Sequence, residues 1–226
     1  MLVSGKGASS LEDPKPAMAE LTNASLIYLF PSPFLHHVWA DSDPLNKELR
    51  EHILARERAH PGMAKTNIGG WHSETGRLEW CGRAGETLLS RMFEAANYAT
   101  YRMLADLGRP MPEFKWTLQA WANVSRAGSF NKPHTHGGAT WSGTYYVDTG
   151  DPPPEAADGT PLLLMDSDQG RANTFFPGLV PMTAFVKPQP GLMVLFPSYL
   201  PHMVYIHQGK RPRISIAFNL RKEPFP

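Results

Sequence analysis

Two histidines separated by one residue, His134 and His136, are the side chains of this sequence best suited to hold a metal ion. Residues i and i+2 of an extended segment point to the same face, so both imidazoles would converge on one point if this segment is extended. Pro133 favours that conformation because it disfavours helical angles at the residue before it. Imidazole is a ligand for iron, copper, nickel and zinc. The alternative is a pair of solvated loop histidines, and the His-x-His pattern alone does not decide between them.

Further side chains that could take part in binding or catalysis lie nearer the C-terminus. His202 follows a buried apolar run and a turn, and it begins the next predicted strand. Arg213 and Ser215 open a later strand, in which alternation places them together on one face and Ile214 on the other. An inward-facing arginine beside a serine is explained by a bound carboxylate, because guanidinium binds carboxylate through two parallel hydrogen bonds.

Short strands are the elements that must position these residues. From residue 114 the sequence changes to β-branched and aromatic runs that are bounded by proline and glycine, with no helical pattern among them. This spacing is typical of a sandwich or jelly roll. The predicted strands cover 115–124, 140–147, 161–166, 182–187, 192–196, 202–207 and 213–220.

The first half of the chain is expected to support this β unit. An apolar stripe predicts a helix from the Asp43-Pro44 pair to about Arg58, and a second stripe predicts a structural helix over 86–107. A short apolar strand is expected at 25–30. The predicted organisation is a disordered tail over 1–22, an N-terminal strand with supporting helices over 23–113 and a catalytic β core over 114–226, all within one structural domain.

Composition excludes several classes of function. The net charge of +1 does not favour nucleic acid or an anionic membrane surface as a partner. No apolar run approaches the roughly 20 residues that span a bilayer, and the N-terminus lacks a signal-peptide pattern. The single cysteine, Cys81, fits a reducing compartment and is expected to pack in the core. We therefore expect a cytoplasmic protein that acts on a small-molecule substrate.

The combination of His-x-His, Phe-Pro-x3-Pro-His and Arg-x-Ser resembles the Fe(II)/2-oxoglutarate-dependent oxygenases. More narrowly, it is similar to their prolyl-hydroxylase-like branch and to a bacterial group of 2OG-Fe(II) oxygenases. The resemblance covers roughly 116–221, together with a Gly-Gly-Trp-x-Ser element at 69–73 that either covers a pocket or braces a core tryptophan. It implies a mainly β protein: a double-stranded β-helix (jelly roll, cupin-like) with an N-terminal helical layer. The implied cofactors are Fe(II), the cosubstrate 2-oxoglutarate (2OG) and O2.

Roles for individual residues follow from this resemblance. His134 matches the first metal ligand and His202 the distal one. Arg213 and Ser215 match the clamp on the distal carboxylate of 2OG, and Tyr146 matches a tyrosine that donates its hydroxyl to the same carboxylate. Alternation places Ser142 on the face of Tyr146. Asn123 either orients substrate or a metal-bound water, or caps a turn. The expected site residues are His134, His136 and His202 for the metal, and Arg213, Ser215, Tyr146, Ser142 and Asn123 for the cosubstrate.

Position 136 departs from the family pattern, which has an Asp or Glu there. Three histidines can hold Fe(II), with one more positive charge than the usual facial triad. In another register His136 is the first ligand and Gly138 takes the place of the acid, as in 2OG-dependent halogenases. Asp166 on a later strand is a further source of a carboxylate. We favour His134, His136 and His202, because both imidazoles of the motif would share one face.

The expected function is that of an Fe(II)- and 2OG-dependent dioxygenase that hydroxylates a C–H bond of a small molecule or an amino acid derivative. The alternatives are a halogenase-like enzyme, a three-His cupin-type dioxygenase that needs no 2OG, and a non-catalytic metal-binding jelly-roll module. The loop before Arg213, which contains His207, is expected to be solvated. Substrate identity and oligomeric state stay open, including a homodimer formed through the N-terminal helices.

Overall fold

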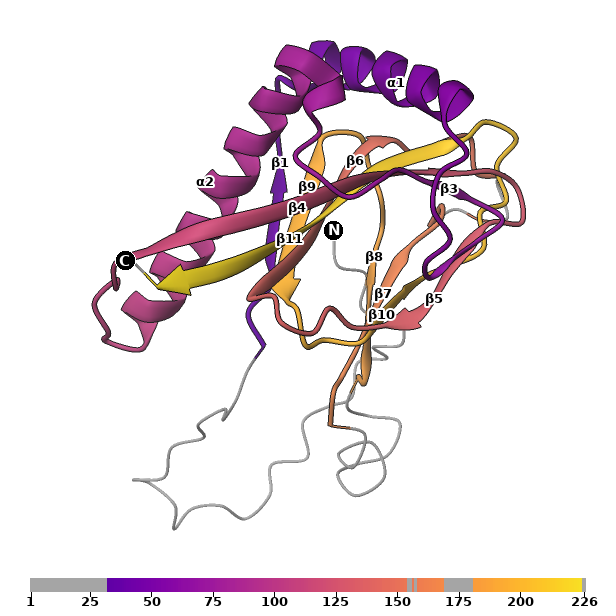
Figure 1. The fold of residues 1–226 in the computed structure, drawn as a ribbon. Coiled ribbons are helices and arrows are strands. Elements are labelled where there is room, and N and C mark those ends of the chain that lie inside the picture. The colour runs from indigo at the N-terminus through magenta and orange to yellow at the C-terminus, as the bar shows by residue number, and fades with distance from the viewer. Residues whose placement is uncertain (1–31, 154–155, 157, 169–180, 225–226) are drawn as a thin grey trace, which may run out of the picture.

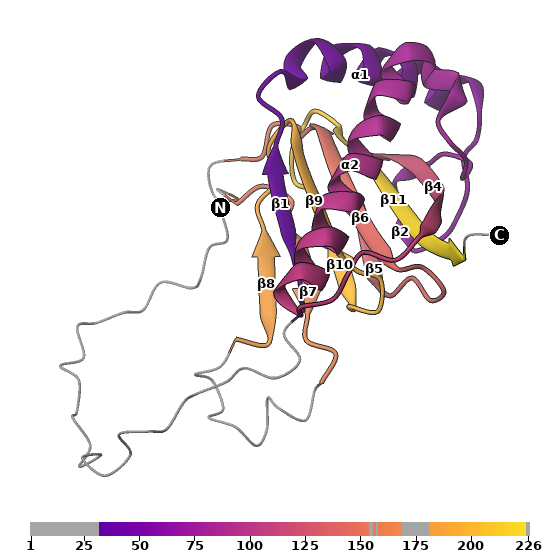
Figure 2. The same ribbon diagram turned by 90° about the vertical axis from the view of Figure 1, so that its left-hand side faces the viewer.

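The computed structural model describes residues 32–153, 156, 158–168 and 181–224. Two antiparallel β-sheets form two layers, and two α-helices cover the outer face of the larger sheet (Figures 1 and 2). The predicted mainly β architecture with supporting helices is confirmed. No helix in the described part of the chain combines the length and the apolar character that crossing a membrane requires.

The larger sheet is built around the long strand β11. β11 pairs with β4 over its whole length, from the Arg213–Ser125 pair to the Pro224–Phe114 pair, and its other edge pairs with β6. In spatial order the six strands are β1 (Leu35–Val38), β9 (Leu192–Pro197), β6 (Trp141–Asp148), β11 (Arg213–Pro224), β4 (Phe114–Ser125) and β3 (Trp71–His72).

The smaller sheet has strand β10 at its centre. His202, the first residue of β10, lies opposite His134 of β5 and opposite Leu164 of β7. Two histidines 68 positions apart in the sequence are therefore neighbours in the sheet. The five strands in spatial order are β2 (Asn67–Ile68), β5 (Phe130–His134), β10 (His202–Val204), β7 (Leu162–Met165) and β8 (Thr183–Val186).

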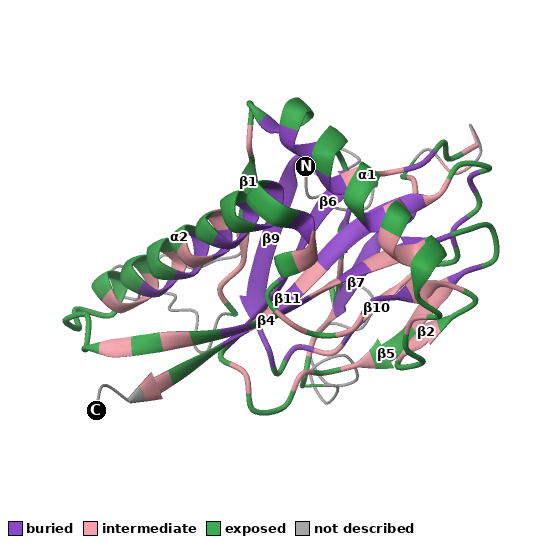
Figure 3. Cartoon of the chain, turned by 45° about the horizontal axis from the view of Figure 1, so that its top comes forward, coloured by how far each residue is buried: buried purple, intermediate pink, exposed green. Residues whose placement is uncertain are grey.

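The helical layer consists of α1 (Ser42–Ala59), a short 3-10 helix η1 (Glu79–Cys81) and α2 (Gly82–Asp106). Figure 3 shows the buried side of both helices turned toward the sheet and the exposed side turned outward. Two buried hydrogen bonds tie the helices to β6: Tyr145 Oη donates to Asn46 Oδ1 at 2.7 Å, and Trp141 Nε1 donates to Thr100 Oγ1 at 2.9 Å. The helices thus hold the strand whose inner face carries Tyr146.

Alternation along β11 separates two compartments. Its even-numbered residues from Ile214 to Leu220 are buried in the core that the helices cover. Its odd-numbered residues from Arg213 to Asn219 line a cavity between the two sheets. The predicted division of this strand into a polar and an apolar face is confirmed. The large core residues under the helices are Leu49, Ile53, Leu88, Met92, Ile214, Ile216 and Phe218.

Some element boundaries differ from those predicted. The helices begin earlier, at Ser42 and Gly82, and β10 ends at Val204. Strands β1, β2, β3 and β5 are not among the predicted strands, and β1 contains the exposed His36 and His37. The predicted tail over 1–22 and the strand over 25–30 lie outside the described residues.

Candidate active site

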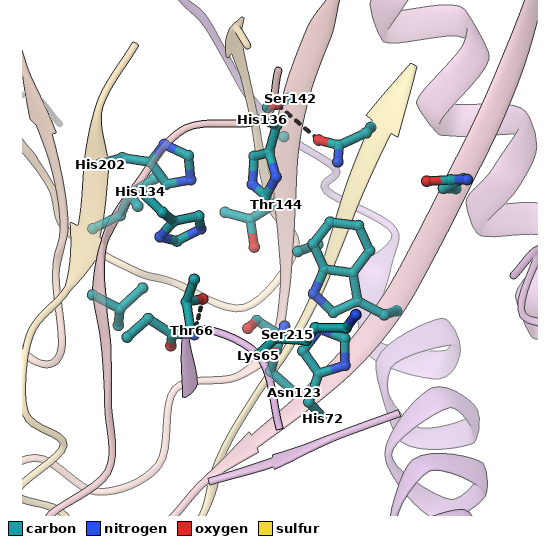
Figure 4. A pocket seen from close by; sticks show the side chains of 18 of the residues that line it. Lys65, Thr66, His72, Asn123, His134, His136, Ser142, Thr144, His202 and Ser215 are labelled. Atoms are coloured by element: carbon teal, nitrogen blue, oxygen red, sulfur yellow. Dashed lines mark hydrogen bonds between the residues drawn. The ribbon is translucent and has the colours of Figure 1, made fainter. Parts of the chain in front are cut away.

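A cavity of about 310 Å³ lies between the two sheets. It is lined by side chains from β4, β6 and β11 of the larger sheet, from β5 and β10 of the smaller one, and from the segment 65–75. Figure 4 shows three histidines gathered on one side of this cavity and His72 and Lys65 on the other. Most residues that the sequence singled out for chemistry therefore line one cavity.

The three histidines are His134, His136 and His202, whose ligand atoms all lie within 4.8 Å of one another. His134 ends β5, and His202 begins β10 directly opposite. His136 lies beyond the end of β5 and so is not held by strand pairing, but its imidazole converges with that of His134 as predicted. Its backbone N–H instead donates to the Ser198 carbonyl at 3.0 Å, which directs the loop and its imidazole toward the other two.

Backbone carbonyls fix the orientation of two of these rings. His134 Nδ1 lies 2.7 Å from the Lys132 carbonyl, and His202 Nδ1 lies 2.9 Å from the Leu200 carbonyl. A carbonyl oxygen only accepts hydrogen bonds, so each Nδ1 carries the proton and each Nε2 keeps its lone pair. Metal-binding histidines are commonly oriented through the second ring nitrogen in this way. The cluster therefore fits a metal ion coordinated through Nε2.

Burial keeps the three imidazoles neutral. Desolvation lowers the pKa of His202 to about 3, with a further contribution from the neighbouring His134, and it lowers the pKa of His136 to about 4. The pKa of His134 is lowered for the same reason, against the opposing effect of its backbone hydrogen bond. Neutral imidazole is the form that coordinates metals, so these side chains need not lose a proton to bind one at neutral pH.

Arg213 lies buried at the start of β11, with 2% of its surface exposed. Its Nη1 donates to Ser215 Oγ at 3.1 Å, and its guanidinium lies over the Tyr146 ring, 5.1 Å from the ring centre. Burial lowers the pKa of Arg213 and raises that of Tyr146. Neither Arg213 Nε nor Tyr146 Oη has a hydrogen-bond partner among the described residues. Buried polar atoms are usually paired, so this pair of free donors fits a polar ligand in the cavity.

Ser142 and Asn123 also line the cavity. The Ser142 hydroxyl donates to Asn219 Oδ1 at 2.8 Å, so its proton is already engaged within the wall. Asn123 lies within β4, two residues before its end, opposite His72 on one side and Ser215 on the other, and it does not cap a turn. Its side chain is therefore placed between the arginine end of the cavity and the segment 65–75.

His72 and Lys65 line the cavity, although the sequence does not predict them as site residues. The His72 ring stacks on Trp121 with 5.5 Å between ring centres, and Trp121 lies 5.7 Å from the His136 ring. His72 Nδ1 lies 2.5 Å from the Ser73 carbonyl, which leaves Nε2 as an acceptor. Of the two roles considered for the glycine-rich element at 69–73, the structure supports the one at the pocket, since the element supplies a cavity wall through His72.

Other candidates lie elsewhere. Asp166 does not line the cavity, and its Oδ1 accepts the Asp168 N–H at 2.9 Å. The expectation that His207 is solvated is wrong, because this residue is fully buried. Thr160 Oγ1 lies 2.7 Å from its Nδ1, and its Nε2 lies 2.8 Å from the Arg211 carbonyl, so His207 joins two loops. Cys81 is buried, and burial raises the pKa of its thiol to about 12, as expected for a cysteine that packs.

Comparisons with known proteins agree with this geometry. Residues 119–219 match a family model described as "Putative 2OG-Fe(II) oxygenase". No curated protein matched the chain.

Among solved structures, a prolyl-4-hydroxylase from Pseudomonas putida is 18% identical, with a TM-score of 0.62 over 85% of this chain and 94% of that one. A prolyl hydroxylase from Trichoplax adhaerens, in complex with a hypoxia inducible factor peptide fragment, is 15% identical, with a TM-score of 0.54 over 84% and 83%. HygX from Streptomyces hygroscopicus, with nickel and 2-oxoglutarate bound, is 12% identical, with a TM-score of 0.51 over 84% and 83%.

These structures share the fold with this chain, and the predicted jelly roll is thereby confirmed. The matched segment runs from β4 to β11 and includes all three clustered histidines and Arg213. The family match over residues 119–219 and the histidine cluster make this part of the chain similar to the 2OG-Fe(II) oxygenases, a family named for its use of 2-oxoglutarate and Fe(II).

Proposed function

We propose that this protein hydroxylates a C–H bond of a small molecule or an amino acid derivative. His134, His136 and His202 hold Fe(II), and Arg213 with Ser215 and Tyr146 binds the distal carboxylate of 2OG. The bound iron and 2OG supply the oxidising chemistry with O2. The protein orients the two small molecules and keeps bulk water away from the metal.

The observation that carries the 2OG assignment is the pair of unpaired buried donors, Arg213 Nε and Tyr146 Oη. A carboxylate accepts hydrogen bonds through both oxygens and matches the fork of a guanidinium. Ser215 already accepts from Arg213 Nη1, which orients the guanidinium. A dicarboxylate with one end here and the other at the histidine cluster would satisfy both donors, and both groups line the same cavity.

The remaining walls support a dry site. Phe196 lies edge-on to the His202 ring, with 5.0 Å between ring centres, and Leu162 and Val204 line the same region. On the other side Trp121 lies between His72 and His136. Apolar walls strengthen the electrostatic interactions inside the cavity, because they exclude the water that would screen them.

Three neutral ligands distinguish this site from the usual pair of histidines with one carboxylate. The described residues offer no carboxylate to the cluster, since the cavity lining contains no Asp or Glu. The metal consequently keeps its full double positive charge, which favours the binding of anionic ligands. Gly138 takes the position of the acid in the alternative register, and it has no side chain to supply a ligand atom. A Cβ added at this position would meet no other atom within 4 Å.

The test is anaerobic titration with Fe(II) followed by 2OG, with the visible absorption band of the iron–2OG chelate as the signal. Succinate formation is then measured in air with ascorbate, and Arg213→Ala is compared with the wild type. The proposal expects a chelate band and succinate in the wild type, both lost in the variant. Iron binding without 2OG binding would instead indicate a three-His dioxygenase of the cupin type, and absence of metal binding a non-catalytic module. Covalent incorporation of chloride would identify a halogenase.

A further inference from the structure

The cavity is unusual in its distribution of charge. Its lining contains two basic side chains, the buried Arg213 at one end and the exposed Lys65 on the wall formed by residues 65–75. None of the described lining residues is an Asp or a Glu. Lys65 also forms no ion pair with a described carboxylate. The cavity therefore lacks an internal counterion.

Metal and cosubstrate do not remove this imbalance. If the proposed function holds, the two positive charges of Fe(II) are balanced by the two negative charges of 2OG, and imidazole ligands contribute none because histidine coordinates metals in its neutral form. The charges of Arg213 and Lys65 then remain. A carboxylate ligand at position 136 would have offset one of them. Lys65 is exposed at the cavity wall, and a positive charge without a carboxylate partner in the lining favours the binding of an anion.

Lys65 belongs to a segment whose backbone is firmly held. Its own N–H donates to Asn67 Oδ1 at 2.8 Å, and the Lys132 N–H donates to the Thr66 carbonyl at 3.0 Å. The latter bond ties the segment to β5, which ends at His134. Figure 4 shows Lys65 facing the cavity on the side opposite the histidine cluster. The ammonium is thus presented across the cavity from the proposed metal.

His72 does not add a second charge to this wall. Burial lowers its pKa, and the positive charge of Lys65 lowers it further, so the imidazole stays neutral at neutral pH. With Nδ1 bonded to the Ser73 carbonyl, its Nε2 is an acceptor. This wall consequently offers a ligand the ammonium group of Lys65 and the hydrogen-bond acceptor His72 Nε2.

We propose that the substrate carries an acid group, a carboxylate or a phosphate, which binds at Lys65 while the carbon to be oxidised faces the three histidines. This inference rests on the proposed function, because it assigns Arg213 to 2OG and leaves Lys65 for the substrate. An acid group at Lys65 restores the charge balance of the loaded cavity. It also orients the substrate from the side opposite the metal.

The test uses protein loaded with Ni(II) in place of iron and saturated with 2OG, so that no turnover occurs. The probes are acetate and methyl phosphate, with acetamide as the neutral analogue of acetate. Paramagnetic relaxation of the probe methyl protons by Ni(II) reports binding near the metal. Lys65→Met is compared with Lys65→Arg, which keeps the charge, and with Lys47→Met, which removes an exposed lysine of α1 outside the cavity.

We expect relaxation of at least one anionic probe and none of acetamide. Affinity for that probe should fall by at least about tenfold in Lys65→Met, because the variant loses a hydrogen bond to a charged group, and it should persist in the two other variants. Preference for acetate or for methyl phosphate separates a carboxylate from a phosphate.

Three results would overturn the inference: no preference for anions over acetamide, anion binding unchanged in Lys65→Met, or loss of 2OG binding in that variant. The second would mean that the anion binds the metal directly, and the third that Lys65 serves the cosubstrate. Failure of the wild type to bind 2OG at all would instead contradict the proposed function, and the 2OG titration detects this separately.

Discussion

Replacement of Arg213 by methionine should have opposite effects on the stability of the protein without and with 2OG. Arg213 Nε is buried without a partner among the described residues, and an unsatisfied buried donor costs about 1–3 kcal/mol. Methionine has a similar length and no polar atom to desolvate. Against this gain, the substitution removes the bond to Ser215 Oγ, which contributes about 1 kcal/mol, and the contact with the Tyr146 ring.

The net expectation for protein without 2OG is that Arg213→Met stabilises it by up to about 1 kcal/mol, which raises Tm by about 2–4 °C for a chain of this size. The effect on 2OG binding is larger and unfavourable. Truncation of one partner of a buried charge pair costs about 2–5 kcal/mol, so the dissociation constant of 2OG should rise by at least about 30-fold.

Calorimetric unfolding of Ni(II)-loaded protein measures both effects. A ligand at about 100 times its dissociation constant stabilises the native state by about 2.7 kcal/mol. At such a 2OG concentration the wild type should therefore become the more stable of the two proteins, and the order of their Tm values should reverse. Arg102→Met serves as the control, because Arg102 is exposed on α2 and forms an ion pair only with Asp106 among the described residues, so both its stability and its 2OG response should match the wild type.

The contrary result is an Arg213→Met variant that is less stable than the wild type without 2OG and gains as much stability from 2OG as the wild type does. In that case the arginine serves the packing of β11 and does not bind the cosubstrate.

Three further predictions concern other parts of the molecule. His136→Ala should weaken Ni(II) binding by at least about tenfold, whereas His136→Asp, which supplies a carboxylate ligand, should retain it; equal affinities of the wild type and the alanine variant in calorimetric titration would remove this residue from the metal site. Cys81 should resist alkylation by iodoacetamide at pH 8 in the folded protein and react at once in denaturant, because burial raises its pKa to about 12 and the thiolate is the reactive form; modification of native protein, seen by mass spectrometry, would contradict this. Gly143→Ala should destabilise the protein by about 1–3 kcal/mol in urea unfolding, because the added methyl group would collide with the Phe218 ring of β11. Gly76→Ala is the control: its methyl group would meet only an ordinary contact at 3.6 Å, so the free energy of unfolding should change little.

Strands with a strong local pattern were predictable from the sequence. β4, β6, β9 and β11 carry β-branched and aromatic residues over six residues or more. The predicted and observed limits of β4, β6 and β9 differ by one residue at most, whereas β11 extends four residues beyond its predicted end. The faces of β6 and β11 were also predictable, because alternation alone determines which side chains point into the cavity. Alternation thus placed Tyr146 and Ser142 on one face, and Arg213 and Ser215 on another, but their roles and those of the histidines followed from the family resemblance.

Features that depend on distant pairing were not predictable. β2 and β3 have two residues each, too few to show a period, and they form because β5 and β4 offer them an edge. His72 and Lys65 reach the cavity only through these pairings, so no local pattern marks them. His207 lies in a polar loop, and its burial depends on Thr160, almost fifty positions earlier, and on a backbone carbonyl.

The division of β11 between two compartments limits how this enzyme can change. Successive residues of this strand alternate between the two compartments: Arg213 lines the cavity, and Ile214 is buried in the core that the helices cover. Loss or gain of one residue within this strand would turn its leucine and isoleucine side chains into the cavity. The same shift would place the arginine side chain in the apolar core. Evolution of the pocket through this segment can therefore proceed by substitution at every second position, but not by insertion or deletion.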